Sequence, residues 1–445
     1  MKKITTLLLI MLLIATVLAG CASNTGNHPA KDGTQGNKGG THSDEGSGGA
    51  AKKQVKLQFS IWGNDAQKAM YEELVAEFKK TNPHIDVEIM TIPFADYQQK
   101  LSIMLASKTA PDIGWLAERM IPQFLESGQL VDIAASVKED NEYDFADIYP
   151  STLDIFSKGD SLYGIPFSTP PMLVYYNKSL FAEKGLKTPT ELYKEDKWTY
   201  DEFLNAAQTI ADPNSGVYGV KLVGDWKNWS DALLPLVWSH GADLFDADGT
   251  AFAMNTAEGQ AALQLYNDLM FKDKTHPKPG DEITFDTGKI GMYTGRYSYV
   301  SKARAITDFE WDIAPMPEGT HGKGTSLGYA GYSVFETEHP EEASAFLKFI
   351  TNATSMGVTS QYFVPSRKSV LESDVFLKAA PQPSAESIQL AVLDQMNDAR
   401  IAPGHKNWQQ IDVKIQTLLD YIYTQSESVE EVLSKMEAEV NSLMK

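Results

Sequence analysis

The sequence predicts an α/β fold, because short strand-like segments alternate with longer helix-like ones along most of the chain. Residues 55–61 alternate apolar and polar side chains, as a half-buried strand does. Met70, Leu74 and Phe78 then recur at helical spacing, and 85–90 is a second strand-like run. A strand, a helix and a strand in this order indicate parallel strands in one sheet.

The alternation continues to the end of the chain. Thr199-Tyr200-Asp201-Glu202 has the form of a capping box that opens a helix, and 428–431 begins a last amphipathic helix. Between them, 333–335 resembles a strand, and Pro340 suits the first turn of another helix. No internal repeat is found, and an all-α or all-β fold is disfavoured.

The first twenty residues have the parts of a secretory signal. Lys2 and Lys3 precede the apolar run 7–14, and small residues lead to Cys21. The segment Leu18-Ala19-Gly20-Cys21 resembles a lipobox, so we expect residues 1–20 to be removed and Cys21 to carry acyl chains, palmitate among them. The alternative is an ordinary signal peptide with an incidental cysteine.

Residues 21–53 are expected to form a lipidated cysteine followed by a flexible linker. After Cys21 this stretch is rich in Gly, Ser, Asn and Lys and has no large apolar residue, so it cannot form a core. Two acyl chains would hold the protein stably on a membrane. Cys21 is the only cysteine, so no intramolecular disulfide can form.

The composition disfavours several classes of partner and chemistry. A formal net charge of −20 disfavours nucleic acid and anionic lipid headgroups as partners. The eight histidines are scattered, so no metal site is predicted, and no phosphate-cradling or dinucleotide motif occurs. We therefore expect no cofactor.

The sequence offers two patterns that hydrolytic enzymes use. Gly324-Thr325-Ser326-Leu327-Gly328 matches a nucleophile elbow, but that motif needs a strand before the serine and a helix after it. The stretch before it is loop-like and the stretch after it does not favour a helix, so a glycine-rich turn is the better interpretation. A glycosidase pair of carboxylates stays open, since acidic residues are abundant and nothing singles out two of them.

Aromatic binding is the stronger signal. Five tryptophans have polar or charged neighbours: Trp62, Trp115, Trp226, Trp229 and Trp408. Sugar rings stack their C–H faces on indole, and their hydroxyls pair with Asp, Asn and Arg. Trp62 is followed by Asn64 and Asp65 directly after a predicted strand, where open α/β sheets bind ligands.

A set of short motifs, in order, resembles the extracellular solute-binding proteins of sugar-type ABC importers, the family that includes maltose-binding proteins. The resemblance spans the globular part and is carried by residues 61–63, 78–83, 105–113, 128–130, 162–167, 175–181, 198–203 and 288–292. It implies a two-lobed periplasmic-binding-protein-like fold of the class II type, with discontinuous lobes joined by a hinge. The first lobe would comprise 54–168 and 331–401, and the second 169–330 and 402–445.

The resemblance also implies a ligand site in the cleft between the lobes. The matching positions are Trp62, Asn64, Asp65, Trp115, Glu118, Arg119, Trp226, Trp229, Arg296, Tyr297, Tyr332 and Trp408. The family often has Gly-x-Trp where this chain has Gly295-Arg296-Tyr297, so Tyr297 is expected to replace the usual stacking platform.

The function implied is reversible capture of a carbohydrate, an oligosaccharide by expectation, and its delivery to the membrane permease of an ABC importer. The protein would be a monomer without enzymatic activity, anchored through Cys21 on the outer face of a Gram-positive cell membrane. Two alternatives remain: a lipid-anchored surface hydrolase, either glycosidase or esterase, and a sensor that reports a sugar to a kinase.

Overall fold

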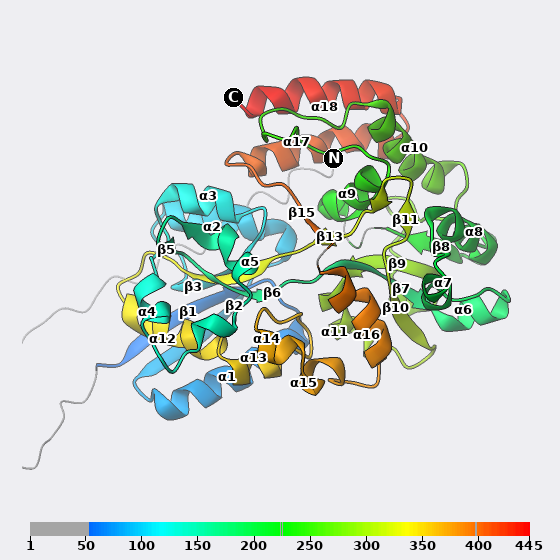
Figure 1. Ribbon diagram of the computed structural model, residues 1–445. Helices are drawn as coiled ribbons and strands as arrows, with labels where there is room; N and C mark the ends of the chain where they lie inside the picture. Colours follow the sequence, from blue (N-terminus) through cyan, green and yellow to red (C-terminus); the bar gives the residue numbers. More distant parts are fainter. Residues whose placement is uncertain (1–52, 223, 225, 397) are drawn as a thin grey trace, which may run out of the picture. The chain divides into compact units, whose positions relative to one another are not determined.

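The computed structural model describes residues 53–222, 224, 226–396 and 398–445 (Figure 1). The expected signal peptide 1–20, Cys21 and nearly all of the expected linker lie outside the described residues. Among the residues that are described, no helix combines the length and the apolar character needed to cross a bilayer.

The first sheet has five strands in the order β2-β1-β3-β14-β6. β1 is parallel to β2 and β3, whereas β14 is antiparallel to β3 and β6. The strands are β1 (Val55–Ile61), β2 (Ile85–Thr91), β3 (Ile113–Ala117), β6 (Ile165–Ser168) and β14 (Ala330–Val334). The predicted parallel pair at the start of the chain is confirmed, and this sheet with the helices packed on it is called the first lobe.

The helices of the first lobe follow from the expected periodicity. Asn64 caps α1 (Asp65–Thr81) in a capping box with Gln67, and Met70, Leu74 and Phe78 are buried on its inner face. The other helices associated with this sheet are α2 (Phe94–Ala106), α3 (Ile121–Ser127), α4 (Ala134–Lys138), α5 (Pro150–Leu153), α12 (Pro340–Ile350) and α13 (Ala353–Thr359).

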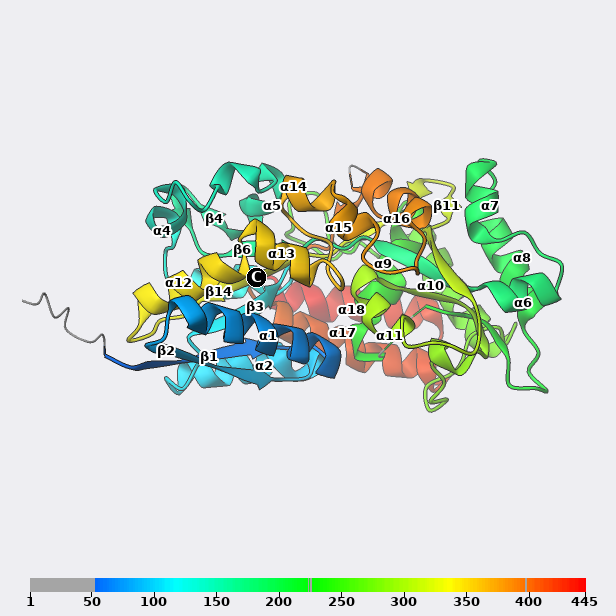
Figure 2. The same ribbon diagram turned by 90° about the horizontal axis from the view of Figure 1, so that it is seen from below.

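The second sheet has four strands in the order β10-β7-β9-β8, and it forms the second lobe. β7 is antiparallel to β9 and β10, and β8 is parallel to β9. The strands are β7 (Met172–Asn177), β8 (Tyr218–Lys221), β9 (Ile290–Arg296) and β10 (Trp311–Pro315). In Figure 2 the blue and yellow elements of the first lobe and the green elements of the second lie at opposite ends.

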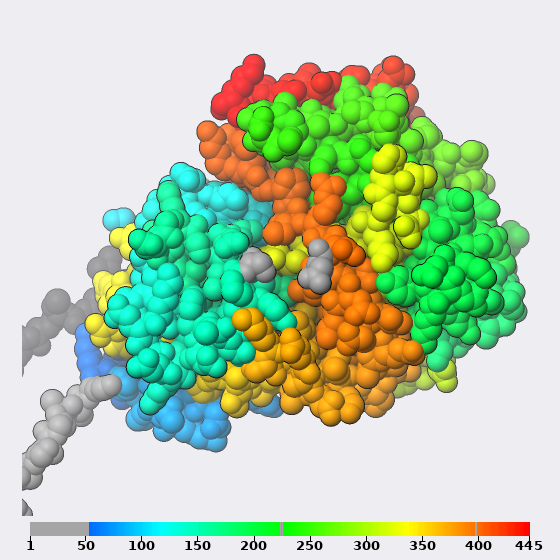
Figure 3. All heavy atoms as spheres, viewed as in Figure 1, coloured from blue at the N-terminus to red at the C-terminus, as the bar shows by residue number. Residues whose placement is uncertain are grey.

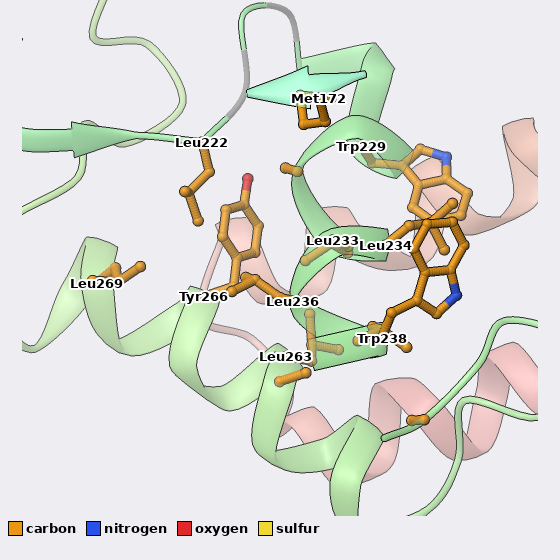
Figure 4. Close-up of a cluster of buried hydrophobic side chains, with 14 of the residues drawn as sticks. Met172, Leu222, Trp229, Leu233, Leu234, Leu236, Trp238, Leu263, Tyr266 and Leu269 are labelled. Atoms are coloured by element: carbon orange, nitrogen blue, oxygen red, sulfur yellow. The ribbon is translucent and has the colours of Figure 1, made fainter. Parts of the chain in front are cut away.

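Helices surround this second sheet and bury a core of their own. They are α6 (Lys178–Glu183), α7 (Pro189–Lys194), α8 (Tyr200–Ile210), α9 (Trp229–Ser239), α10 (Ala257–Phe271), α11 (Val300–Ala303), α17 (Trp408–Tyr423) and α18 (Val429–Leu443). Nearly every residue of α9 is buried. Figure 4 shows Trp229 and Trp238 of this helix among leucines, with Tyr266 of α10 nearby.

Two segments of the chain connect the lobes here, and a third lies beside them. The first runs from β6 into β7, the second contains β13 (Ser326–Leu327) before β14, and the third contains β15 (Arg400–Ile401). β13 pairs with β15, and Leu327 also forms a bridge with Pro171. The remaining short strands are β4 (Ser157–Lys158), β5 (Ser161–Leu162), β11 (Glu318–Gly319) and β12 (Gly322–Lys323).

The segment 364–395 packs differently from the sequence expectation, which assigns all of 331–401 to the first lobe. Its helices are α14 (Lys368–Leu371), α15 (Asp374–Leu377) and α16 (Ala385–Ala391). Leu371, Phe376 and Ile388 share a hydrophobic cluster with strands of the second sheet. In Figure 3 this yellow-orange segment lies between the cyan and green surfaces. The lobe boundaries remain a prediction, and this packing favours a crossover near 364 over one at 401.

Candidate functional site

A cavity of about 460 Å³ lies between the two lobes and is lined by both of them. The first lobe contributes Trp62, Asn64, Gln67, Phe94, Trp115, Glu118 and Arg119. The second lobe contributes Asn228, Asp231, Tyr293, Arg296, Tyr299, Ser301 and Lys302. Ser168, Pro170, Gly328 and Tyr329, from two of the connecting segments, complete the wall.

Most of these side chains reach the cavity because strands end beside it. Trp62 follows the last residue of β1, Glu118 and Arg119 follow β3, and Arg296 ends β9. Loops at the carboxyl ends of strands are where open α/β sheets place their ligands. The rule that ligands bind beyond the carboxyl ends of strands, which predicts Trp62 from the sequence, therefore holds for the first lobe.

The first lobe presents aromatic rings that hold one another in place. The ring of Trp62 is only partly buried, and its centroid lies 4.9 Å from that of Trp115 and 5.2 Å from that of Phe94. Tyr97 packs edge-on against Trp62 at 5.1 Å. Edge-to-face contacts of this kind fix ring orientation, so Trp62 offers a pre-oriented apolar face at the cavity.

The second lobe has a matching pair of phenols. The ring centroids of Tyr293 and Tyr299 lie 4.6 Å apart, and both residues line the cavity. Burial raises the pKa of both phenols well above the ordinary value, and neighbouring negative charge raises it further. Both hydroxyls are therefore protonated at neutral pH and able to donate a hydrogen bond.

Arg296 forms a dense set of contacts at the back of the cavity. Its Nη2 atom lies 3.0 Å from Asp231 Oδ1 and 3.7 Å from Glu118 Oε1. Its Nη1 atom donates to the carbonyl oxygens of Pro170 and Ser326. The backbone N–H of Tyr329 donates to the other oxygen of Glu118, at 3.0 Å. Among the described residues the cavity wall has two carboxylates, Glu118 and Asp231, and both lie beside this one guanidinium.

Two further contacts join the lobes at the rim. Asn64 Nδ2 donates to Ser301 Oγ at 2.9 Å, and Lys227 Nζ lies 3.5 Å from Asp96 Oδ1. Arg119 stacks its guanidinium 4.3 Å from the centre of the Phe94 ring. With these contacts the two walls face each other at close range.

Six of the twelve predicted site residues line this cavity: Trp62, Asn64, Trp115, Glu118, Arg119 and Arg296. Asp65 is exposed as the first residue of α1 and does not line it. Trp115 is fully buried, and its indole N–H has no acceptor among the described residues.

The structure does not bring the predicted tryptophans of the second lobe to the cavity. Trp229 is 1% exposed, stacks on Trp408, and donates its indole N–H to Asp412 at 2.8 Å. Trp226 packs edge-on against His276 and Tyr423. The expected contacts of these tryptophans with a ligand therefore find no support among the described residues.

The two predicted tyrosines are also in the interior. Tyr297 is fully buried and packs against Phe376, while the neighbouring Tyr299 lines the cavity instead. Tyr332 lies in β14, stacks on Phe167, and shares a hydrogen bond between hydroxyls with Tyr71. For Tyr332, strand alternation explains this, because a residue that points into the core of a sheet cannot also face the cleft.

Ser326 does not occupy a nucleophile elbow. It is buried in the two-residue strand β13, and no helix follows it. Its hydroxyl oxygen accepts a hydrogen bond from Arg296 Nη2 at 3.2 Å. The glycine-rich turn suggested by the sequence is not found at this position either, because Ser326 and Leu327 form a strand that pairs with β15.

Sequence reasoning missed several residues of the cavity wall: Phe94, Asn228, Asp231, Tyr293 and Tyr299. Tyr299 lies three residues beyond β9, so the strand-end rule applied to the second sheet would have found it, whereas Tyr293 lies in the middle of that strand and the rule would not have found it. Asp231 lies on the first turn of α9, and no local motif marks it.

The family model for bacterial extracellular solute-binding proteins matches residues 62–357. The chain belongs to this family. The match covers more than half of the chain and includes the second sheet, every strand of the first sheet except β1, and most of the cavity wall.

Curated relatives of this solute-binding protein align over most of their length. A putative binding protein of Brucella abortus is 22% identical over 388 residues, which cover 84% of this chain and 90% of the relative. The diacetylchitobiose binding protein DasA of Streptomyces coelicolor is 26% identical, covering 78% of this chain and 82% of DasA. The arabinooligosaccharide-binding protein of Bacillus subtilis is 23% identical, with 78% and 76% covered.

Solved structures confirm the two-lobed fold of this solute-binding protein. The substrate-binding protein Lmo0181 of Listeria monocytogenes, in complex with cycloalternan, superposes with a TM-score of 0.78 at 23% identity. That match covers 88% of this chain and 99% of Lmo0181. Maltose-bound MalE3 of T. maritima gives a TM-score of 0.76 at 21% identity, covering 87% and 100%.

Proposed function

We propose that this solute-binding protein captures a carbohydrate in the cavity between its lobes and delivers it unchanged to the permease of an ABC importer. One observation carries the proposal: aromatic faces from both lobes, Trp62 on one and Tyr299 on the other, line the same cavity. Hydrogen-bonding side chains such as Asn64 and Asp231 lie between them. This combination suits a ring with apolar faces and a hydroxylated edge.

The printed names of the relatives agree with this ligand class. They include binding proteins for diacetylchitobiose and arabinooligosaccharides, and structures with bound cycloalternan and maltose. A cavity of about 460 Å³ lies within the usual range of ligand sites, roughly 300–1,000 Å³. An oligosaccharide of few rings is therefore the ligand that we propose.

Binding without turnover is the proposed activity. The carboxylates among the described residues of the cavity wall are Glu118 and Asp231, and both lie beside Arg296, which leaves neither of these two poised as a free acid or base. A sugar that contacts both walls would stabilise the closed form by its greater affinity for that form.

We further propose that Cys21 is lipidated and tethers the monomeric protein to the outer face of the cell membrane, where the tether raises its concentration near the permease. The Cys21→Ser variant should leave the membrane fraction while its ligand affinity stays unchanged. Retention of that variant in the membrane fraction would contradict lipid anchoring. A sensor that reports the same sugar to a kinase is the alternative use of this fold.

The test is a thermal-shift screen of mono- and oligosaccharides, followed by calorimetry on the hits and chromatography of the ligand after incubation. We expect micromolar or tighter binding of at least one oligosaccharide, recovered intact. Binding of no carbohydrate would overturn the proposed ligand class, and recovery of cleaved sugar would favour the hydrolase alternative.

A further inference from the structure

The contacts of Arg296 suggest a role that ligand binding does not explain. Its guanidinium makes four hydrogen bonds, to the carbonyl oxygens of Pro170 and Ser326, to Ser326 Oγ and to Asp231 Oδ1. Both terminal nitrogens are therefore already engaged by the protein. The side chain is only 15% exposed. An arginine used in this way has little capacity left for reading a ligand.

The partners of Arg296 come from both lobes and from two segments that connect them. Glu118 follows β3 of the first lobe, and Asp231 lies on α9 of the second. Pro170 and Ser326 belong to two of the connecting segments, which are also joined by the hydrogen bond from Gly328 N to Pro170 O at 2.9 Å. One side chain thus links both lobes and the hinge.

The charges around Arg296 determine whether the two lobes attract or repel each other at this point. A single nitrogen, Nη2, lies beside one carboxylate from each lobe, Asp231 at 3.0 Å and Glu118 at 3.7 Å. The side chains of Glu118 and Asp231 are 11% and 28% exposed, so solvent screens them only partly. Without the guanidinium, two like charges from opposite lobes would face each other across the cleft.

We propose that Arg296 is a positioning residue that holds the lobes together electrostatically, acting through Glu118 and Asp231 rather than by contact with the ligand. With Arg296 present, approach of the lobes brings Glu118 toward a positive charge. With Arg296 removed, the same approach brings Glu118 toward Asp231, and the open form is favoured. The balance between open and closed forms therefore shifts when this charge is removed, even though Asn64–Ser301 and Lys227–Asp96 also join the lobes.

The inference concerns the ligand-free protein, so its test does not depend on which solute is bound. Two exposed positions, Ile103 on α2 and Val413 on α17, would be changed to cysteine and spin-labelled in the full chain carrying Cys21→Ser. Pulsed dipolar spectroscopy then reports the distance distribution between the lobes in each variant.

The order of the interlobe distances in three variants distinguishes an effect of charge from an effect of lost packing. Arg296→Gln should shift the distribution to longer distances than the parent, because the two carboxylates then repel. Adding Glu118→Gln to it should reverse most of that shift, since one of the repelling charges is gone. Glu118→Gln alone should give a smaller shift in the same direction, because it removes only the attraction between the lobes.

A matched control is Lys348→Gln, which removes a partly buried ion pair with Asp140 inside the first lobe and should leave the distances unchanged. If the closed form falls to a tenth of its population, a carbohydrate should bind about tenfold more weakly to Arg296→Gln. Equal opening in the single and double variants would overturn the proposal. So would unchanged distances in Glu118→Gln, a variant that keeps an acceptor for the Tyr329 N–H and is expected to fold.

Discussion

The two walls of the cavity differ in how their tryptophans are used. In the first lobe, Trp62 and Trp115 line the cavity, one partly open and one buried behind it. In the second lobe, Trp229 and Trp408 stack on each other within the core. The same residue type in similarly polar sequence contexts is thus a cavity wall in one lobe and a structural element in the other.

The difference lies in the elements that carry these residues. Trp62 follows a strand, where the chain leaves the sheet and its side chains reach the cleft. Trp229 begins α9, a helix buried on nearly all sides, so polar neighbours in the sequence do not imply an exposed indole. We learn that the ends of strands predict the site better than local polarity does.

The largest effect that this comparison predicts is loss of stability in Trp229→Ala. Removing a fully buried indole leaves a cavity beside Trp408 and takes away the donor to Asp412 Oδ1, while Asp412 Oδ2 keeps its hydrogen bond from Gln416. The free energy of unfolding should fall by about 3–5 kcal/mol. Denaturant unfolding measures this, and calorimetry on the folded variant should give near-normal carbohydrate affinity. A stable variant that does not bind would reverse the assignment of Trp229 to the core.

The next largest effect is a dependence of stability on pH, which arises from His276 in the second lobe. His276 accepts a hydrogen bond from the Leu222 N–H at 2.9 Å, with its other ring nitrogen near the carbonyl of Pro277. Burial lowers the pKa of His276 to about 4, opposed in part by the Pro277 hydrogen bond, while Lys221 lowers it further. The unfolded chain therefore binds a proton near pH 6.5 that the folded protein does not accept until about pH 4.

Because the pKa of His276 is lower in the folded than in the unfolded state, this contribution to stability is complete above about pH 6.5. As the pH decreases toward 4, the free energy of unfolding falls by up to about 3 kcal/mol. Thermal melts between pH 7 and 4 should show the fall, and His276→Gln should flatten it. Since Leu222 lines the cavity, amide exchange should increase on that wall first. An equal slope in His276→Gln would assign the pH dependence to other groups.

Ligand affinity should depend on Trp62 more than on any tryptophan of the second lobe. Trp62→Ala removes a partly exposed ring whose neighbours Phe94 and Tyr97 remain in place. We expect a loss of about 2 kcal/mol in binding, roughly 30-fold in the dissociation constant, with little change in the melting temperature. Unchanged affinity would show that the ligand does not use this face.

The smallest effect distinguishes two buried indole N–H groups that have no acceptor among the described residues. Trp115 lines the cavity, whereas Trp311 lies in the core of the second lobe. Trp115→Phe should weaken carbohydrate binding by about 1 kcal/mol, because the smaller ring holds the Trp62 face less firmly in its orientation. Trp311→Phe is the matched control and should leave affinity unchanged. Equal affinities in both variants would show that Trp115 does not orient Trp62 for binding.

Much of the fold could be predicted from the sequence, because periodicity and capping are local. The strand at 55–61 and the helix through Met70, Leu74 and Phe78 were found in this way. The site was predictable mainly where side chains lie at the ends of strands, as Trp62 does after β1 and Arg296 does at the end of β9. Tyr293 and Asp231 depend on the register of β9 and on the packing of α9, which no single segment determines.

The central claim is that a carbohydrate binds between the two aromatic walls. A crystal structure of the protein with the tightest-binding oligosaccharide tests it most directly. We predict a sugar ring stacked on Trp62, with Tyr299 on the opposite side and no contact to Trp229 or Trp408. Density for the sugar outside this cavity, or stacked on a second-lobe tryptophan, would contradict the account.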